Sequence, residues 1–144
     1  MVIVADQITK AWIATIFRHG GSLAVTEFFD LVLVFNPGAA FSFLHDAGGW
    51  QKWFFVALAC GISAWIVFML RQHARERLLP TALALILGGA LGNVIDRLRY
   101  DAVVDFLDFH WAGHHFPAFN VADCAISVGV ALILWQQFTD KETS

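Results

Sequence analysis

The feature that most constrains this sequence is a run at residues 53–70, WFFVALACGISAWIVFML, which contains no charged side chain. A helix of this length can cross a hydrocarbon core of about 30 Å. The composition points the same way, because 58% of the residues are hydrophobic and 15% are charged, against roughly 25% charged in an ordinary soluble domain. These values argue against soluble globular, disordered and collagen-like chains. They indicate an integral membrane protein.

Three further segments complete a predicted bundle of four transmembrane helices, at residues 1–17, 52–70, 80–97 and 119–138. Proline is well suited to the first turn of a helix, which favours a start at residue 80. The small residues of the sequence GGALG at 88–92 allow a neighbouring helix to come close. The span at 119–138 contains a single charge and has Trp135 near its end as an interfacial anchor.

Residues 1–17 form the shortest span, reaching about 25 Å as a helix. They contain Asp6 and Lys10, and we expect no cleavable signal peptide there because no basic segment precedes an apolar run. Asp6 and Lys10 are four residues apart, so on a helix they share a face and can neutralise each other.

The charge of the connecting segments predicts the topology. The connection between the second and third spans carries Arg71, Arg75 and Arg77, and short Arg-rich loops face the cytoplasm. Both termini are then cytoplasmic, and residues 18–51 and 98–117 lie outside. Within the first outer segment, residues 24–46 are apolar and are broken by the turn sequence Asn36-Pro37-Gly38, which predicts strand, turn and strand. We therefore expect one all-α membrane domain over residues 1–144, with a small extracytoplasmic β element.

Charge and cysteine content exclude several functions. The net charge is −3 and the pI is about 6.0, so there is no global basic field for a nucleic acid. Cys60 and Cys124 lie in separate apolar runs, which suits neither a disulfide framework nor a metal cluster.

Carboxylates at membrane depth are costly and need a reason. Asp96 and Arg97 are adjacent, for which an interfacial salt bridge is the default interpretation. Asp105 and Asp123 are predicted near the outer membrane boundary, at the same depth. Two carboxylates in one apolar site share a proton, so that one can activate water while the other polarises a carbonyl group, as in aspartic peptidases. The alternative is two unrelated interfacial aspartates.

Other chemistries fit the residues less well. His110, His114 and His115, together with Asp108, could imitate a metal site, but the chain has no HExxH motif. A transporter would place carboxylates near mid-membrane within inverted repeats. A non-catalytic scaffold would not need the amides of Asn36, Asn93 and Asn120. A metallopeptidase would be sensitive to chelators.

Four blocks of sequence, in order, resemble the lipoprotein signal peptidase family (signal peptidase II). They are DQITK at residues 6–10, NPGAAFS at 36–42, GGALGNVIDR at 88–97 followed by VDF at 104–106, and FNVAD at 119–123. These are similar to the family motifs DxxTK, NxGxAFS, GGAxGNxxDR…VxDF and FNxAD. The chain differs in starting only five residues before Asp6, and in having Cys124 where a small polar residue is more usual.

The resemblance implies a role for each matching residue. It makes Asp105 and Asp123 a catalytic dyad that needs no metal or cofactor, and it gives Asp6 and Lys10 a structural role. The substrate would be a diacylglyceryl-modified prolipoprotein, cut before its lipidated cysteine in the bacterial cytoplasmic (inner) membrane. The partners would be this substrate and membrane lipids, with the active site near the periplasmic face. The substrate-binding residues would be Asn36, Gly38, Asn93, Arg97 and Asn120.

Overall fold

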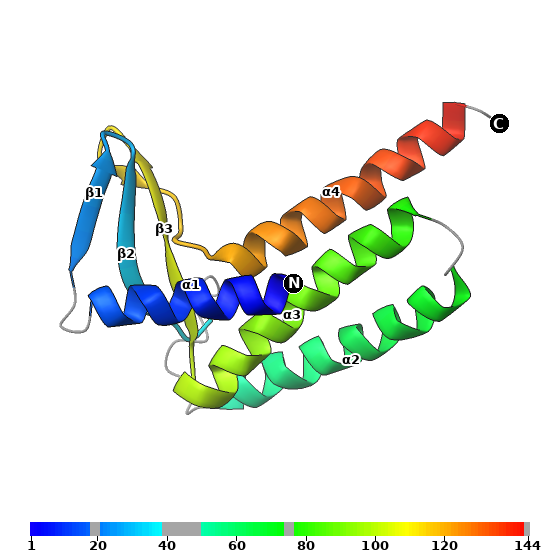
Figure 1. The fold of residues 1–144 in the computed structure, drawn as a ribbon, viewed down its shortest axis with the longest axis horizontal. Coiled ribbons are helices and arrows are strands. Elements are labelled where there is room, and N and C mark those ends of the chain that lie inside the picture. Colours follow the sequence, from blue (N-terminus) through cyan, green and yellow to red (C-terminus); the bar gives the residue numbers. More distant parts are fainter. Residues whose placement is uncertain (18–20, 39–49, 74–76, 143–144) are drawn as a thin grey trace.

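A computed structural model describes residues 1–17, 21–38, 50–73 and 77–142 and shows four helices and a small antiparallel sheet (Figure 1). The central helix is α3, which contacts each of the other three helices, and the sheet lies at one end of the helices. The elements are, in chain order, α1 (Val2–Ile16), β1 (Ser22–Thr26), β2 (Phe29–Asn36), α2 (Trp50–Gln72), α3 (Leu78–Tyr100), β3 (Val103–Trp111), β4 (His114–His115) and α4 (Val121–Glu142).

Three of the helices are long and apolar enough to cross a membrane: Trp50–Gln72, Leu78–Tyr100 and Val121–Thr139. They overlap the predicted spans at 52–70, 80–97 and 119–138. Helix α1 has 15 residues, or about 22 Å of helix, which is short for a hydrocarbon core of about 30 Å. The chain is therefore a mostly helical protein with three candidate membrane spans, and the fourth span stays a prediction.

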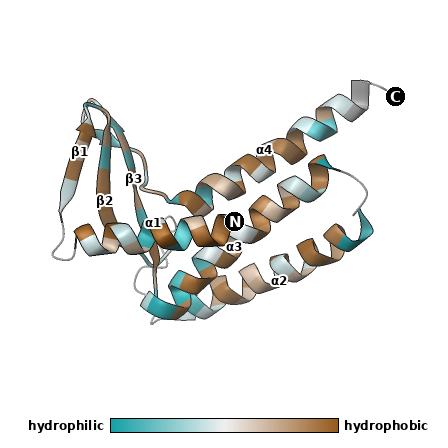
Figure 2. Cartoon of the chain, viewed as in Figure 1, coloured by the Kyte–Doolittle hydropathy of each residue, from teal (hydrophilic) through white to brown (hydrophobic). Residues whose placement is uncertain are grey.

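The helices are hydrophobic along most of their length (Figure 2), and the exposure of their side chains is that expected for a protein surrounded by lipid. Large apolar side chains on the helices face outward, and Trp53, Trp65 and Trp135 are each more than half exposed. In contrast, Asp6 and Asn120 are completely buried. Because lipid solvates apolar side chains and water does not, this inverted pattern suits a membrane and not an aqueous environment.

Glycines of α3 and α4 allow the helices to pack closely. A Cβ atom added at Gly89 would collide with the backbone carbonyl oxygen of Ala122 on α4, and one at Gly129 would lie 2.6 Å from the carbonyl oxygen of Ala82 on α3. On another face of α3, a Cβ at Gly92 would lie 2.7 Å from Asp6 Oδ2. The small residues predicted to permit close approach thus do so at the contacts of α3 with both α1 and α4.

The sheet has the strand order β1-β2-β3-β4. Antiparallel pairing places Asn36 opposite Val103 and Val34 opposite Asp105. Strand β2 ends at Asn36 and the chain bends at Pro37 and Gly38, where the sequence predicted a turn. A second turn, which was not predicted, joins β1 to β2 at Glu27-Phe28. A strand after Gly38 would fall at residues 39–46, outside the described part of the chain.

Strand β3 follows α3 after a very short connection. Asp101 has φ 60° and ψ 6°, the left-handed conformation that commonly ends a helix. The chain therefore turns back immediately, and β3 passes close to the end of α3 that it has just left. This segment was expected only to be a short outer loop, yet its strand carries Asp105 to the helices.

Candidate active site

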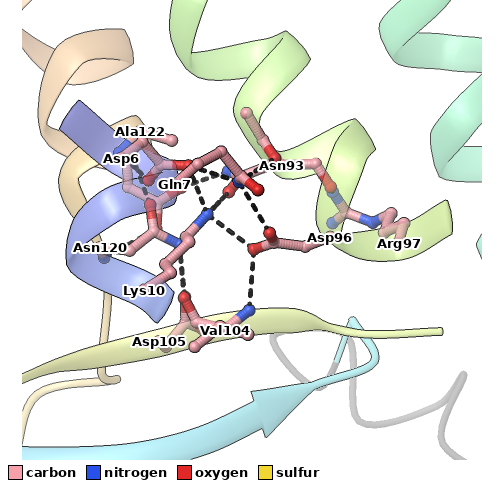
Figure 3. Close-up of polar contacts among 12 residues, drawn as sticks. Asp6, Gln7, Lys10, Asn93, Asp96, Arg97, Val104, Asp105, Asn120 and Ala122 are labelled. Atoms are coloured by element: carbon pink, nitrogen blue, oxygen red, sulfur yellow. Dashed lines mark hydrogen bonds and ion pairs between the residues drawn. The ribbon is translucent and has the colours of Figure 1, made fainter. Parts of the chain in front are cut away.

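A buried polar cluster lies where α1, α3, β3 and the start of α4 meet (Figure 3). Its members come from segments far apart in the sequence, and most are almost inaccessible to solvent. Buried polar groups are costly unless they are hydrogen-bonded. The cluster consists of Asp6, Gln7, Lys10, Asn36, Asn93, Asp96, Arg97, Asp105, Asn120 and Asp123.

Asp105 is held by two side-chain amides. Asn36 Nδ2 donates a hydrogen bond to Asp105 Oδ2 over 2.9 Å, and Asn120 Nδ2 donates one to Oδ1 over 2.7 Å. Asp105 is only 2% exposed. Burial raises the pKa of Asp105 to about 6, and the negative charge of Asp123 also raises it, while the two hydrogen bonds and the charge of Lys10 lower it.

Asp123 lies in the first turn of α4, where it closes a capping box with Asn120. The backbone N–H of Asp123 donates to Asn120 Oδ1 over 3.0 Å, and the backbone N–H of Asn120 donates to Asp123 Oδ2 over 3.2 Å. The other oxygen, Asp123 Oδ1, accepts a hydrogen bond of 2.8 Å from Asn93 Nδ2. The start of α4 therefore fixes the position of this carboxylate through backbone and side-chain hydrogen bonds.

The structure therefore brings Asp105 and Asp123 into one hydrogen-bonded group with Asn120 between them. Asn120 contacts Asp105 through its side chain and Asp123 through both its side chain and its backbone. A hollow of about 440 Å³ on the outer side of α4 reaches Asp123 and is lined mainly by apolar side chains such as Phe119 and Val128. Two interacting carboxylates, one of them with a raised pKa, form an arrangement that can hold one proton between them.

Asp6 and Lys10 form the expected pair, with Lys10 Nζ 2.9 Å from Asp6 Oδ2. Asp6 does more than balance this charge, because its Oδ1 accepts a hydrogen bond of 2.9 Å from the backbone N–H of Ala122 in the first turn of α4. Helix α1 thus satisfies one of the free N–H groups at the start of α4. This contact also fixes the position of Asp123, the next residue along the chain.

The expected ion pair between Asp96 and Arg97 is not the one that the structure contains. Asp96 Oδ2 instead lies 2.7 Å from Lys10 Nζ, because neighbouring residues on a helix point about 100° apart. Arg97 points elsewhere, with its guanidinium 5.0 Å from the centre of the Phe55 ring on α2. Its Nη1 donates a hydrogen bond of 3.4 Å to the backbone oxygen of Asn93.

Gly38 lies beside the same aromatic ring. Its backbone N–H donates to Asn36 Oδ1 over 3.0 Å, and a Cβ atom at this position would lie 2.7 Å from Phe55 Cε2. Its φ of 114° is rarely adopted by residues other than glycine. The rest of this sequence block, residues 39–42, lies outside the described residues.

Sequence reasoning missed Gln7. Its Nε2 lies 2.9 Å from Asp96 Oδ1, 3.2 Å from Asp6 Oδ2 and 3.3 Å from the carbonyl oxygen of Gly92. Gln7 therefore joins α1 to α3. The sequence offered one signal for Gln7, which is a polar amide next to Asp6 in an apolar helix. Because adjacent helical positions do not share a face, this signal did not identify the partners of Gln7.

The histidines that could imitate a metal site, His110, His114 and His115, lie in strands β3 and β4. His115 Nδ1 is 2.9 Å from Asp108 Oδ2, and His110 Nε2 is 3.2 Å from Asp30 Oδ1. Within the described ranges, no group of three or more His, Cys, Asp or Glu side chains is arranged to hold a metal ion. Cys60 and Cys124 are free thiols.

Known proteins resemble this chain over nearly its whole length. The family profile described as "Signal peptidase (SPase) II" matches residues 1–139. A lipoprotein signal peptidase of Azoarcus sp. is 56% identical over 136 residues, covering 94% of this chain and 77% of that protein. One from Ralstonia nicotianae is 58% identical over 132 residues, covering 92% of this chain and 76% of that protein.

Two solved structures of bacterial membrane enzymes are similar in fold to this chain. One chain, described as a bacterial membrane enzyme, superimposes with a TM-score of 0.87 at 34% identity, covering 99% of this chain and 86% of that chain. A second chain with the same description has a TM-score of 0.85 at 35% identity, covering 96% of this chain and 88% of that chain.

Proposed function

The chain belongs to the signal peptidase II family of lipoprotein signal peptidases, and from this premise we propose that Asp105 and Asp123 are its catalytic dyad. With them the enzyme removes the signal peptide from diacylglyceryl-modified prolipoproteins by cutting before the lipidated cysteine. The observation that carries the proposal is that Asn120 is hydrogen-bonded to both carboxylates.

The dyad performs hydrolysis by carrying one proton. A water molecule between the carboxylates gives a proton to the ionised one as its oxygen attacks the scissile carbonyl carbon, and the protonated carboxyl group donates its proton to the carbonyl oxygen. The tetrahedral intermediate then collapses with cleavage of the C–N bond. The leaving amine takes the proton that came from the water, and the other carboxylate regains its proton from the intermediate, which restores the starting dyad.

Residues around the dyad are suited to holding an extended substrate backbone. Arg97 carries guanidinium donors beside Phe55, and the backbone of Gly38 packs closely against the same ring. Asn36 and Asn93 each donate to a dyad carboxylate, which leaves the carboxylates oriented before substrate binds.

The site lies at the end of the helices that we assign to the periplasmic side. Arg71 is in the last turn of α2 and Arg77 is the N-cap of α3, and these ends of the two helices lie opposite the end that carries the sheet (Figure 1). Short Arg-rich loops remain in the cytoplasm. The dyad would then lie near the periplasmic face, both termini would be cytoplasmic, and acyl chains in the outer leaflet could reach the apolar hollow beside Asp123.

The test is cleavage of a diacylglyceryl prolipoprotein, followed by gel shift, with purified Asp105→Asn and Asp123→Asn variants. We expect neither variant to cleave, although both remain folded and inserted in the membrane. Asp101→Asn is the matched control, because Asp101 is 80% exposed, pairs with Lys52 and ends α3 in a left-handed conformation that asparagine also adopts. Cleavage by either dyad variant at the wild-type rate would refute the assignment.

A further inference from the structure

Building on the proposed dyad, we propose that Lys10 is a positioning residue that acts through Asn93 to orient Asp123. Its ammonium group fixes which end of the Asn93 amide faces the dyad. Lys10 thus contributes to the rate of peptide cleavage as well as to the packing of α1.

The contacts of Lys10 use its full donor capacity. Nζ lies 2.9 Å from Asp6 Oδ2, 2.7 Å from Asp96 Oδ2 and 2.9 Å from Asn93 Oδ1. An ammonium group has three hydrogens, so each contact has its own donor. Lys10 is 3% exposed, which leaves little room for water to replace any of the three.

The side-chain amide of Asn93 has an accepting end and a donating end, and its neighbours distinguish them. Oδ1 accepts from Lys10 Nζ and, over 3.3 Å, from Asn120 Nδ2. Nδ2 donates to Asp123 Oδ1 over 2.8 Å. If the amide were reversed, its NH₂ group would face two other donors and its oxygen would face the Asp123 carboxylate. Lys10 supplies the stronger of the two donors that exclude this arrangement.

Two of the three partners of Lys10 are carboxylates, and both also accept hydrogen bonds from other groups. Charge balance explains the contacts with these carboxylates, but it does not explain the contact with the neutral amide of Asn93. Asp6 Oδ1 accepts from the backbone of Ala122. Asp96 accepts from Gln7 through Oδ1 and from the backbone N–H of Val104 through Oδ2. Asn93 Oδ1, in contrast, has only the longer contact with Asn120 besides Lys10 among the hydrogen bonds that the structure describes. Figure 3 shows Lys10 placed between Asp96 and Asn93.

The direct test is the kinetics of Lys10→Met, which keeps an unbranched side chain of similar length but removes its charge and donors. We expect kcat to fall roughly ten- to a hundred-fold, as for loss of one hydrogen bond involving a charged group, while KM changes far less. Lys52→Met is the matched control, because Lys52 is also ion-paired, but to Asp101, an exposed residue that ends α3. We expect that control to keep wild-type kcat. An unchanged kcat in Lys10→Met, or a loss confined to KM, would overturn the proposal.

A double-mutant cycle tests whether the effect passes through Asn93. Single-turnover assays at excess enzyme compare Lys10→Met, Asn93→Ala and the double variant, so that slow variants stay measurable. If Lys10 acts through Asn93, the double variant should be no slower than Asn93→Ala. Multiplied rate losses would mean that Lys10 only supports the fold, and would overturn the proposal.

Further variants separate this proposal from a failure to fold and from a failure of the proposed dyad. If Lys10→Met does not fold, combining it with Asp96→Asn removes one of the two negative charges that lose their ammonium partner, and the same loss of kcat is expected from the folded double variant. Wild-type kcat in that double variant would overturn the proposal.

If Asp105→Asn and Asp123→Asn were active, the dyad itself would be wrong. Additive effects of Lys10 and Asn93 with an inactive Asp123→Asn would overturn only the role of Lys10.

Discussion

The hydrogen bond from Asn36 to Asp105 should set the pH range of the enzyme. Burial raises the pKa of Asp105 to about 6, and the Asn36 amide acts against this rise because it favours the ionised carboxylate. The proposed mechanism needs one proton on the dyad, so kcat/KM should fall as the pH rises above the pKa at which that proton is lost. Removing the donor with Asn36→Ala stabilises the protonated form and should move this fall to higher pH.

The size of the shift follows from the geometry. The hydrogen bond is 2.9 Å long and its acceptor is an almost fully buried carboxylate. A hydrogen bond to a charged group contributes about 1.5–3 kcal/mol, and one pKa unit corresponds to about 1.36 kcal/mol. The expected shift is therefore about one to two units, from about 6 in the wild type to roughly 7–8 in Asn36→Ala.

The assay is kcat/KM for prolipoprotein cleavage, measured from about pH 5 to about pH 9 and fitted to a bell-shaped profile. The pH at which kcat/KM falls on the basic side of the profile (the basic limb) is read separately from the maximum of kcat/KM, because that maximum also reflects any loss of substrate binding. Asn36→Asp is the informative companion, since it keeps an acceptor for the N–H of Gly38 but places a negative charge beside Asp105. Its basic limb should move further upward. A limb that stays in place or moves downward in Asn36→Ala would show that Asp105 does not control the profile.

Three other outcomes are expected. Gly89→Ala should lower the thermal unfolding temperature in detergent, because its methyl group meets the backbone of Ala122, and overpacking costs about 1–3 kcal/mol; Gly61→Ala, with no atom within 4 Å of the added Cβ, should not, and equal effects would contradict this packing argument. Asp6→Asn should also lower the unfolding temperature, because Lys10 loses one of its buried carboxylates and the free energy of unfolding falls by up to about 3 kcal/mol; an unchanged melting curve would count against that pair. Incubation with EDTA should leave kcat/KM unchanged, since two carboxylates suffice for the reaction, and loss of activity restored by added metal would favour a metallopeptidase.

Local patterns in the sequence were sufficient to predict the three candidate membrane helices and one ion pair. Hydropathy summed over about twenty residues indicates a helix that lipid can solvate, and α2, α3 and α4 lie where those sums are high. The spacing of Asp6 and Lys10 follows helical geometry, and the structure contains that pair. Both inferences depend on residues within one helix.

The β element shows what local patterns found and what they missed. Turn composition placed a turn at Asn36-Pro37-Gly38, where β2 ends, and overlooked the tight turn at Glu27-Phe28, which contains none of the residues that usually mark turns. Strand β3 was missed because its apolar stretch follows α3 after a connection of only two residues. Pairing with β2 is what makes that segment a strand, and this pairing joins residues about seventy positions apart.

Hydropathy alone was enough to identify a membrane protein and to show which polar side chains must be accommodated within it. The partners of these side chains became visible in the folded chain: Asp96 pairs with Lys10 and not with Arg97, Asp6 bonds to Ala122 across 116 positions, and Asn120 lies between Asp105 and Asp123. Hydropathy is a sum over neighbouring residues, whereas a buried polar group must find its partner wherever close helix packing brings one within hydrogen-bonding distance.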